Sequence, residues 1–223
     1  MENLVLLPGY GFKSSIWDNF IKQLSGSYNI ITIDILKDQD EILDNLVKVP
    51  NKSYLCGWSL GGLIATKFCT LFPEKQHYLV TIASSPNFQK VLNQAWVVKL
   101  RDVLKQDFCK FINILTCSVL YPNVSIRNVR VLNKYLIKDA AYFEKYLDFL
   151  LNTNVEDGYR VLNSKSFHLI AERDAIVSHE TLKQWQSNEF ADTDSYVFRG
   201  HYPFFYNQIL SIIIEKWILK NKI

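Results

Sequence analysis

The segment Gly57-Trp58-Ser59-Leu60-Gly61 fits the pattern G-x-S-x-G and offers the clearest chemistry in the chain. An apolar run at 53–57 precedes the serine and a helix-like stretch at 60–71 follows, which predicts a sharp strand-to-helix turn at Ser59. Larger side chains two positions before or after the serine would collide with backbone. N–H groups at the helix start would stabilise an oxyanion. The pattern indicates a nucleophile, and the alternative is a packing turn with an idle serine.

A serine hydroxyl needs a positioned base to accept its proton. Of the four histidines, His201 is favoured because it lies in a loop between a predicted strand and the last helix. His168 falls inside a predicted strand and is expected to be packed. His77 is expected at the surface, and His179 at the start of a helix.

The carboxylate that orients the base is expected in the loop after the preceding strand. The segment 171–177 supplies Glu172 and Asp174, and Asp174 is preferred because it lies further into the loop. Asp34 is the competing residue. The order Ser59, Asp174, His201 is that of α/β-hydrolases and differs from the orders in chymotrypsin and subtilisin.

An oxyanion formed at Ser59 would need two N–H donors. The backbone N–H of Leu60 is one candidate. The other is expected from the glycine loop after the first strand, at Tyr10, because Pro8 has no N–H.

Short apolar strands alternate with helices along most of the chain, which predicts a mostly parallel sheet covered on both faces. The expected strands are 4–7, 29–35, 53–57, 78–83, 167–171 and 195–198, and the expected core helices are 15–24, 40–47, 60–71 and 206–220. The stretch 88–163 has no good strand. We therefore expect an α/β core at 1–87 and 164–223, with a helical insertion at 88–163 that forms a lid over the strands' carboxyl ends.

Length and composition fit one globular domain: 223 residues, of which 48% are hydrophobic and 21% charged. There is no run of about 18 apolar residues, and the first residues lead straight into a strand, so a cytoplasmic protein is expected. A net charge of +3 does not indicate nucleic-acid binding. The four cysteines are expected to be buried free thiols. With no nucleotide motif or ligand cluster, neither a cofactor nor a metal is expected.

The helical insertion carries the excess positive charge, with 11 Lys and Arg against 7 Asp and Glu. On one continuous helix over 125–143, Arg127, Arg130, Lys134 and Lys138 would share an arc of roughly 80°. A solvated amphipathic helix and a docking stripe for an acidic partner are both open readings of this pattern.

The chain resembles the α/β-hydrolase superfamily and, more narrowly, the BioH-type pimeloyl-[acyl-carrier protein] methyl ester esterases of biotin synthesis. The likeness lies in the segments 6–11 with Trp17, 57–62 and 83–88, and around His201. It implies a cofactor-free serine carboxylesterase that releases methanol and docks an acidic acyl-carrier protein through arginines of the lid. A monomer that binds neither nucleic acid nor membrane is expected. The expected substrate-binding residues are Trp58, Phe88, Phe111, Phe143 and Tyr202.

Two alternatives remain open at this point. One is another small-ester or thioester hydrolase of the same fold. The other is a non-catalytic binding protein on the α/β-hydrolase fold, for which an intact triad is unfavourable.

Overall fold

A computed structural model describes residues 1–26, 28–35 and 39–222. Within these residues, six strands form one sheet in the order β2-β1-β3-β4-β5-β6, with every neighbouring pair parallel. The strands are β1 (Glu2–Leu7), β2 (Tyr28–Thr32), β3 (Tyr54–Trp58), β4 (Tyr78–Ile82), β5 (Ser166–Glu172) and β6 (Ala191–Arg199). The predicted fold class is confirmed.

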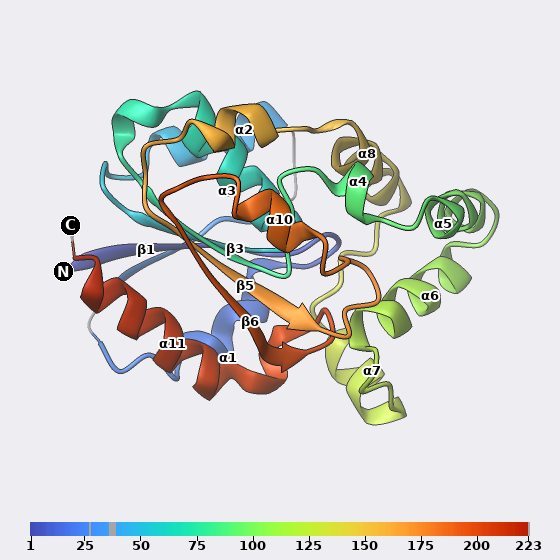
Figure 1. Cartoon of the computed structure of the whole chain (residues 1–223). Helices are drawn as coiled ribbons and strands as arrows, with labels where there is room; N and C mark the ends of the chain where they lie inside the picture. Colours follow the sequence, from blue (N-terminus) through green and yellow to red (C-terminus); the bar gives the residue numbers. More distant parts are fainter. Residues whose placement is uncertain (27, 36–38, 223) are drawn as a thin grey trace.

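Helices cover both faces of the sheet, which explains why the central strands are apolar throughout. On one side lie α1 (Asp18–Ile21) and α11 (Asn207–Lys220), and on the other lie α2 (Gln39–Val47) and α3 (Leu60–Leu71) (Figure 1). All residues of β3 are buried. The sheet is therefore the centre of the hydrophobic core.

The strand order reverses direction between β1 and β3. From β1 the chain moves outward to β2, and then returns to place β3 on the other side of β1. In an open parallel sheet, the crevice at such a point, beyond the carboxyl ends of the strands, is where ligands bind. The loop after β1 and the turn after β3 meet at this crevice.

Residues 83–165 are all described and contribute no strand to the sheet. Their helices are α4 (Phe88–Val91), α5 (Gln94–Gln106), α6 (Phe108–Leu120), α7 (Ile126–Leu132), α8 (Ala140–Asn152) and α9 (Glu156–Arg160). Figure 1 shows α5 to α8 beyond the end of the sheet toward which the β5 arrow points. The helical insertion thus lies at the carboxyl ends of the strands.

The helix expected over 15–24 is shorter and divided. A 3₁₀ turn covers Ser14–Trp17 and α1 ends at Ile21. Beyond it, the N–H groups of Ser25 and Gly26 donate to the Glu215 carboxylate of α11 at 2.9 and 2.6 Å. This tertiary contact replaces the bonds that would continue the helix. A further short helix, α10 (Thr181–Trp185), joins β5 to β6.

Over the described ranges, no helix is both long and apolar enough to cross a membrane.

Candidate active site

Ser59 lies on a strained turn between β3 and α3, with φ 52° and ψ −117°. Its neighbours leave no room for side chains at the flanking glycines. A Cβ on Gly57 would lie 2.3 Å from the backbone of Gly61, and a Cβ on Gly61 would lie 2.4 Å from the carbonyl oxygen of Leu7. The Ser59 N–H donates to the carbonyl of Ile82 on β4 at 2.9 Å. Close packing on both sides therefore holds the turn that presents Ser59.

His201 follows β6 and lies within hydrogen-bond distance of both other predicted triad residues. Its Nε2 is 2.9 Å from the Ser59 Oγ, and its Nδ1 is 2.8 Å from the Asp174 Oδ2. Since a carboxylate only accepts, Nδ1 carries the proton and Nε2 is free to accept one from the serine hydroxyl. The arrangement can therefore activate Ser59 as a nucleophile.

Asp174 lies in the loop after β5, and its side chain is only 2% exposed. The second carboxylate oxygen, Oδ1, accepts from the N–H groups of Ile176 and Val177 at 2.8 and 3.0 Å. These two bonds fix the carboxylate so that Oδ2 faces His201. The competing residue Asp34 is exposed instead and accepts from the Ser14 N–H at 2.6 Å.

Two hydrogen bonds outside the triad hold its members in place. The Trp58 Nε1 donates to the carbonyl of His201 at 2.9 Å, and the Ser84 hydroxyl donates to the carbonyl of Ser59 at 2.7 Å. Sequence reasoning did not find this role for Ser84. The sequence feature related to this contact is the glycine at position 62. A side chain there would collide with Ser84, since a Cβ on Gly62 would lie 2.5 Å from the Ser84 Oγ.

The two residues predicted to supply oxyanion donors, Leu60 and Tyr10, both lie close to Ser59. Leu60 is the first residue of α3, and its N–H is one of those at a helix start that have no acceptor within the helix. Tyr10 lines the cavity that also contains Ser59. The backbone of the β1 loop packs on α3, since a Cβ on Gly61 would lie 2.6 Å from the Pro8 carbonyl oxygen. Their use as donors stays a prediction.

The remaining histidines include one wrong prediction. His77 is 2% exposed rather than at the surface, because its Nδ1 accepts the Ser53 N–H at 3.1 Å in front of β4. Burial, together with the nearby Lys75 ammonium, lowers the pKa of His77 to about 4. His168 is packed as expected, with its ring stacked on Trp185 at 4.0 Å. His179 is exposed.

A narrow cavity of about 30 Å³ adjoins Ser59 and His201. Apart from these two residues, its described lining is aliphatic or aromatic: Tyr10, Phe12, Trp58, Phe88, Leu92, Trp96, Leu100, Leu115, Val119, Leu147, Leu150 and Ile176. Most of these come from the helical insertion. The cavity suits a small apolar group.

Of the five residues predicted to bind substrate, Trp58 and Phe88 line this cavity and three do not. Phe111 and Phe143 are fully buried and pack on each other, with ring centroids 5.0 Å apart. Tyr202 packs against Phe205 behind the base. Phe143 and Tyr202 instead contact residues that line the cavity: their ring centroids lie 5.1 Å from that of Tyr10 and 6.1 Å from that of Trp58, respectively.

The expected continuous helix over 125–143 is wrong. α7 ends at Leu132, and the chain then runs extended beside the loop after β1, where the N–H of Ile137 donates to Gly11 O at 2.8 Å. Arg127 and Arg130 therefore share α7, while the four predicted docking residues do not form one helical stripe. The other two, Lys134 and Lys138, lie in the connection to α8; all four are exposed.

The cysteines differ in part from expectation. Cys56 and Cys69 are buried free thiols, but Cys109 and Cys117 on α6 are exposed. They lie on the outer face because the apolar side of α6, including Phe111 and Leu115, packs inward. In the part of the chain that the structure describes, no group of His, Cys, Asp and Glu could hold a metal ion.

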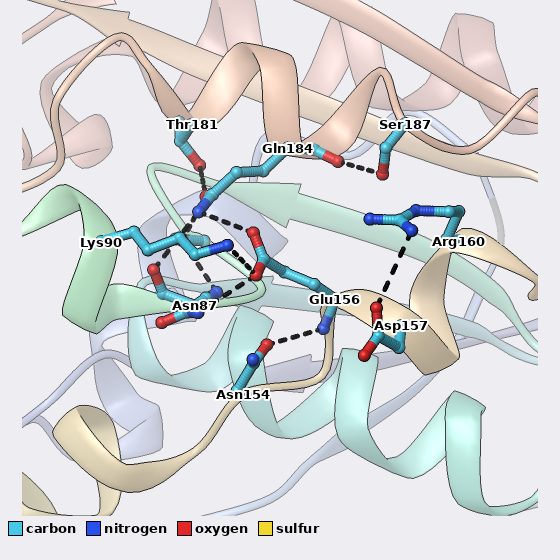
Figure 2. A network of polar contacts seen from close by, with 10 residues as sticks. Asn87, Lys90, Asn154, Glu156, Asp157, Arg160, Thr181, Gln184 and Ser187 are labelled. Atoms are coloured by element: carbon cyan, nitrogen blue, oxygen red, sulfur yellow. Dashed lines mark hydrogen bonds and ion pairs between the residues drawn. The ribbon is translucent and has the colours of Figure 1, made fainter.

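A partly buried polar network joins the two ends of the helical insertion to the core (Figure 2). Glu156, at the start of α9, accepts from Lys90 Nζ at 2.5 Å, from Asn87 Nδ2 at 3.1 Å and from Gln184 Nε2 at 3.2 Å. Asn87 directly precedes the cavity residue Phe88, and Gln184 belongs to the core helix α10. The network therefore fixes the cavity wall at the point where the insertion leaves the sheet.

A serine on the turn after β3, an aspartate after β5 and a histidine after β6 are the arrangement of the α/β-hydrolases, and the chain has this fold. A hydrolase from Oleispira antarctica superposes with a TM-score of 0.87 at 12% identity, covering 98% of this chain and 91% of that one. The esterase EaEST from Exiguobacterium antarcticum gives 0.84 at 13% identity, covering 98% and 92%.

In sequence, the chain is similar to proteins named pimeloyl-[acyl-carrier protein] methyl ester esterase. It is 26% identical to the one from Wigglesworthia glossinidia brevipalpis over 245 aligned positions, which cover 98% of this chain and 94% of that protein. It is 34% identical to the one from Aliivibrio salmonicida over 123 residues, 48% of this chain. This second match spans 47% of the relative, about half its length. No protein-family model matches the chain.

Proposed function

We propose that the chain is a cofactor-free serine hydrolase that cleaves carboxylic esters. The observation that carries this proposal is the hydrogen-bonded chain from Ser59 through His201 to Asp174, at 2.9 and 2.8 Å. All three side chains are buried beside an apolar cavity, where charges that form during the reaction interact strongly.

In the proposed reaction, the Ser59 Oγ attacks the ester carbonyl carbon while His201 Nε2 accepts its proton. The tetrahedral oxyanion is stabilised by the backbone N–H groups of Leu60 and Tyr10. His201, held by Asp174, then gives the proton to the leaving alcohol. Water, deprotonated by the same imidazole, releases the acid from the acyl-enzyme and restores Ser59.

The favoured substrate is the methyl ester of pimeloyl-[acyl-carrier protein], which would yield methanol and pimeloyl-[acyl-carrier protein] in biotin synthesis. The names of the sequence relatives support this choice. The methyl ester end of the substrate's pimeloyl group is small and uncharged, which suits the apolar cavity next to Ser59.

The proposed partner is an acyl-carrier protein, which is strongly acidic. Arg127 and Arg130 are exposed on α7, within an insertion that has 11 basic against 7 acidic residues. Complementary charge would speed the encounter and orient the carrier. Charge reversal at both arginines is expected to raise KM for the carrier-bound ester and leave KM for free dimethyl pimelate unchanged. Lys220→Glu on α11 is the matched control.

The direct test is mass-spectrometric detection of demethylation of pimeloyl-[acyl-carrier protein] methyl ester by the wild type and by Ser59→Ala. Loss of the methyl group with the wild type, at least about 1,000-fold slower with the variant, is the expected result. Failure of a folded wild type on this substrate, with intact hydrolysis of p-nitrophenyl esters, would remove the carrier-bound substrate and keep the esterase.

The second candidate is a hydrolase of another small ester or thioester, favoured by the narrow cavity. A series of p-nitrophenyl esters of increasing acyl length tests it: a sharp preference for acetate, without demethylation of the carrier-bound ester, would favour this candidate. If the wild type hydrolyses none of these substrates and a fluorophosphonate does not label Ser59, both hydrolase candidates are wrong and a non-catalytic binding protein is favoured.

A further inference from the structure

The loop after β1 is hydrogen-bonded to the helical insertion by two tyrosine hydroxyls. The hydroxyl of Tyr10 donates to the carbonyl of Phe143, in the first turn of α8, at 2.6 Å. The N–H of Gly11 donates to the hydroxyl of Tyr142 in a longer bond of 3.4 Å. Both contacts are buried and join residues more than 130 positions apart in the chain.

Backbone hydrogen bonds reinforce this connection. The Lys13 N–H donates to the Tyr135 carbonyl at 2.9 Å, and the Ile137 N–H donates to the Gly11 carbonyl at 2.8 Å. Between these bonds the two segments form an isolated antiparallel bridge. The loop that carries Tyr10 is thus paired, as in a small sheet, with the connection between α7 and α8.

The fit between the loop and α8 is close. Gly11 adopts φ 85°, a conformation that favours glycine, and a Cβ there would lie 2.3 Å from Cε1 of the Phe143 ring. The Tyr10 ring meets the Phe143 ring edge-on, with centroids 5.1 Å apart. Any displacement of α8 therefore acts directly on the backbone at Tyr10 and Gly11.

The hydroxyl of Tyr10 has no role in the hydrolytic steps. Burial, with smaller contributions from the neighbouring Tyr142 and Asp148, raises the pKa of Tyr10 well above its ordinary value. The raised pKa favours the protonated hydroxyl, which donates to the Phe143 carbonyl.

We propose that the helical insertion positions the oxyanion-hole donor, with the Tyr10 hydroxyl as the positioning group that links the two. This inference rests on the proposed serine-esterase function. The bonds to α8 and to the segment before it hold the β1 loop so that the N–H of Tyr10 can donate to the carbonyl oxygen of a substrate bound at Ser59.

The test compares three conservative variants on p-nitrophenyl butyrate: Tyr10→Phe, Tyr142→Phe and the control Tyr54→Phe. The Tyr54 hydroxyl also donates to a buried carbonyl, that of Asn221 at 2.8 Å, but at the other end of the sheet. Tyr10→Phe is expected to lower kcat about tenfold with KM nearly unchanged, less than the roughly 100- to 1,000-fold cost of deleting an oxyanion donor. Tyr142→Phe shifts kcat in the same direction by a smaller factor.

A second readout separates positioning from loss of folded enzyme. An alkyl trifluoromethyl ketone forms a tetrahedral adduct with Ser59 whose oxyanion occupies the same site, so its Ki is expected to rise in Tyr10→Phe in step with the loss in kcat/KM. An unchanged Ki, or a kcat within about twofold of that of Tyr54→Phe, overturns the inference. An inactive wild type would instead contradict the proposed function, which keeps the two failures distinct.

Discussion

The indole Nε1 of Trp58 donates to the backbone carbonyl of His201 at 2.9 Å, so the residue beside the nucleophile holds the loop of the base. The same indole fills the space next to the β1 loop, where a Cβ on Gly9 would lie 2.8 Å from its Cε3. Trp58 thereby links the loops after β1, β3 and β6.

Trp58→Phe keeps an aromatic ring and removes this donor. We expect kcat to fall about tenfold and the free energy of unfolding to fall by about 1–3 kcal/mol, because the His201 carbonyl loses its partner inside the protein. Trp217→Phe is the matched control, since its Nε1 donates to Asp192 at 2.8 Å on the far side of the sheet. A similar loss of stability without loss of kcat is expected there. Equal kcat values in the two variants would contradict the role of Trp58.

Asp174→Asn preserves the size of the side chain but removes the charge that holds the His201 Nδ1 proton. By analogy with other serine triads, kcat should fall about 1,000- to 10,000-fold. Asp34→Asn tests the competing residue and is expected to leave kcat unchanged, because an asparagine oxygen can still accept the Ser14 N–H. The reverse pattern in steady-state kinetics on a p-nitrophenyl ester would reassign the acid.

Glu156→Gln weakens the network between the helical insertion and α10. Burial disfavours the charged carboxylate, but hydrogen bonds from Lys90, Asn87 and Gln184 outweigh it and lower the pKa of Glu156. Its contribution is therefore present above its ordinary pKa of 4.5 and is lost as the pH falls below that value. We expect the variant to lose about 1–2 kcal/mol at pH 7 and less at pH 4. The control Glu144→Gln, on an exposed ion pair with Lys105, should change little.

The lowered pKa of His77 leads us to expect a loss of stability in mild acid. Its pKa falls from the ordinary value of 6.5 to about 4 in the folded protein, so the folded state resists protonation more than the unfolded chain does. The associated stability is present above about pH 6.5 and is lost as the pH falls toward 4, by at most about 3 kcal/mol. His77→Asn retains an acceptor for the Ser53 N–H. Urea unfolding from pH 7 to 4 should show a smaller decline in the variant than in the wild type. Buried His168 titrates in both proteins and cancels in the comparison.

Local sequence was sufficient to place the six strands, the strand-to-helix turn and the residues Ser59, Asp174 and His201. The bounds of two strands differ most, since β6 (Ala191–Arg199) is longer than the predicted 195–198 and β2 ends at Thr32 rather than at 35. Uninterrupted apolar runs identify strands buried on both faces. Glycine at positions 57 and 61 indicates a sharp turn at Ser59, because the backbone in such a turn comes too close for a side chain at either position. The order of the loops along a parallel sheet then brings Asp174 and His201 to one edge. These features follow from short-range sterics and from sheet topology.

The tertiary structure decided what depended on contacts between distant segments. A helical pattern continues through 133–139, but pairing with the loop at Gly11 and Lys13 ends α7 at Leu132 and divides the basic stripe. The position of His77 before a strand and close to Pro73 favours the surface, but contacts with distant residues, including the bond from the Ser53 N–H, leave it buried. Likewise, the aromatic residues of the insertion differ in whether they line the cavity, and only packing distinguishes Phe88 from Phe143. The sequence determined the chemistry at Ser59; long-range hydrogen bonds and packing, which periodicity does not encode, decided the shape around it.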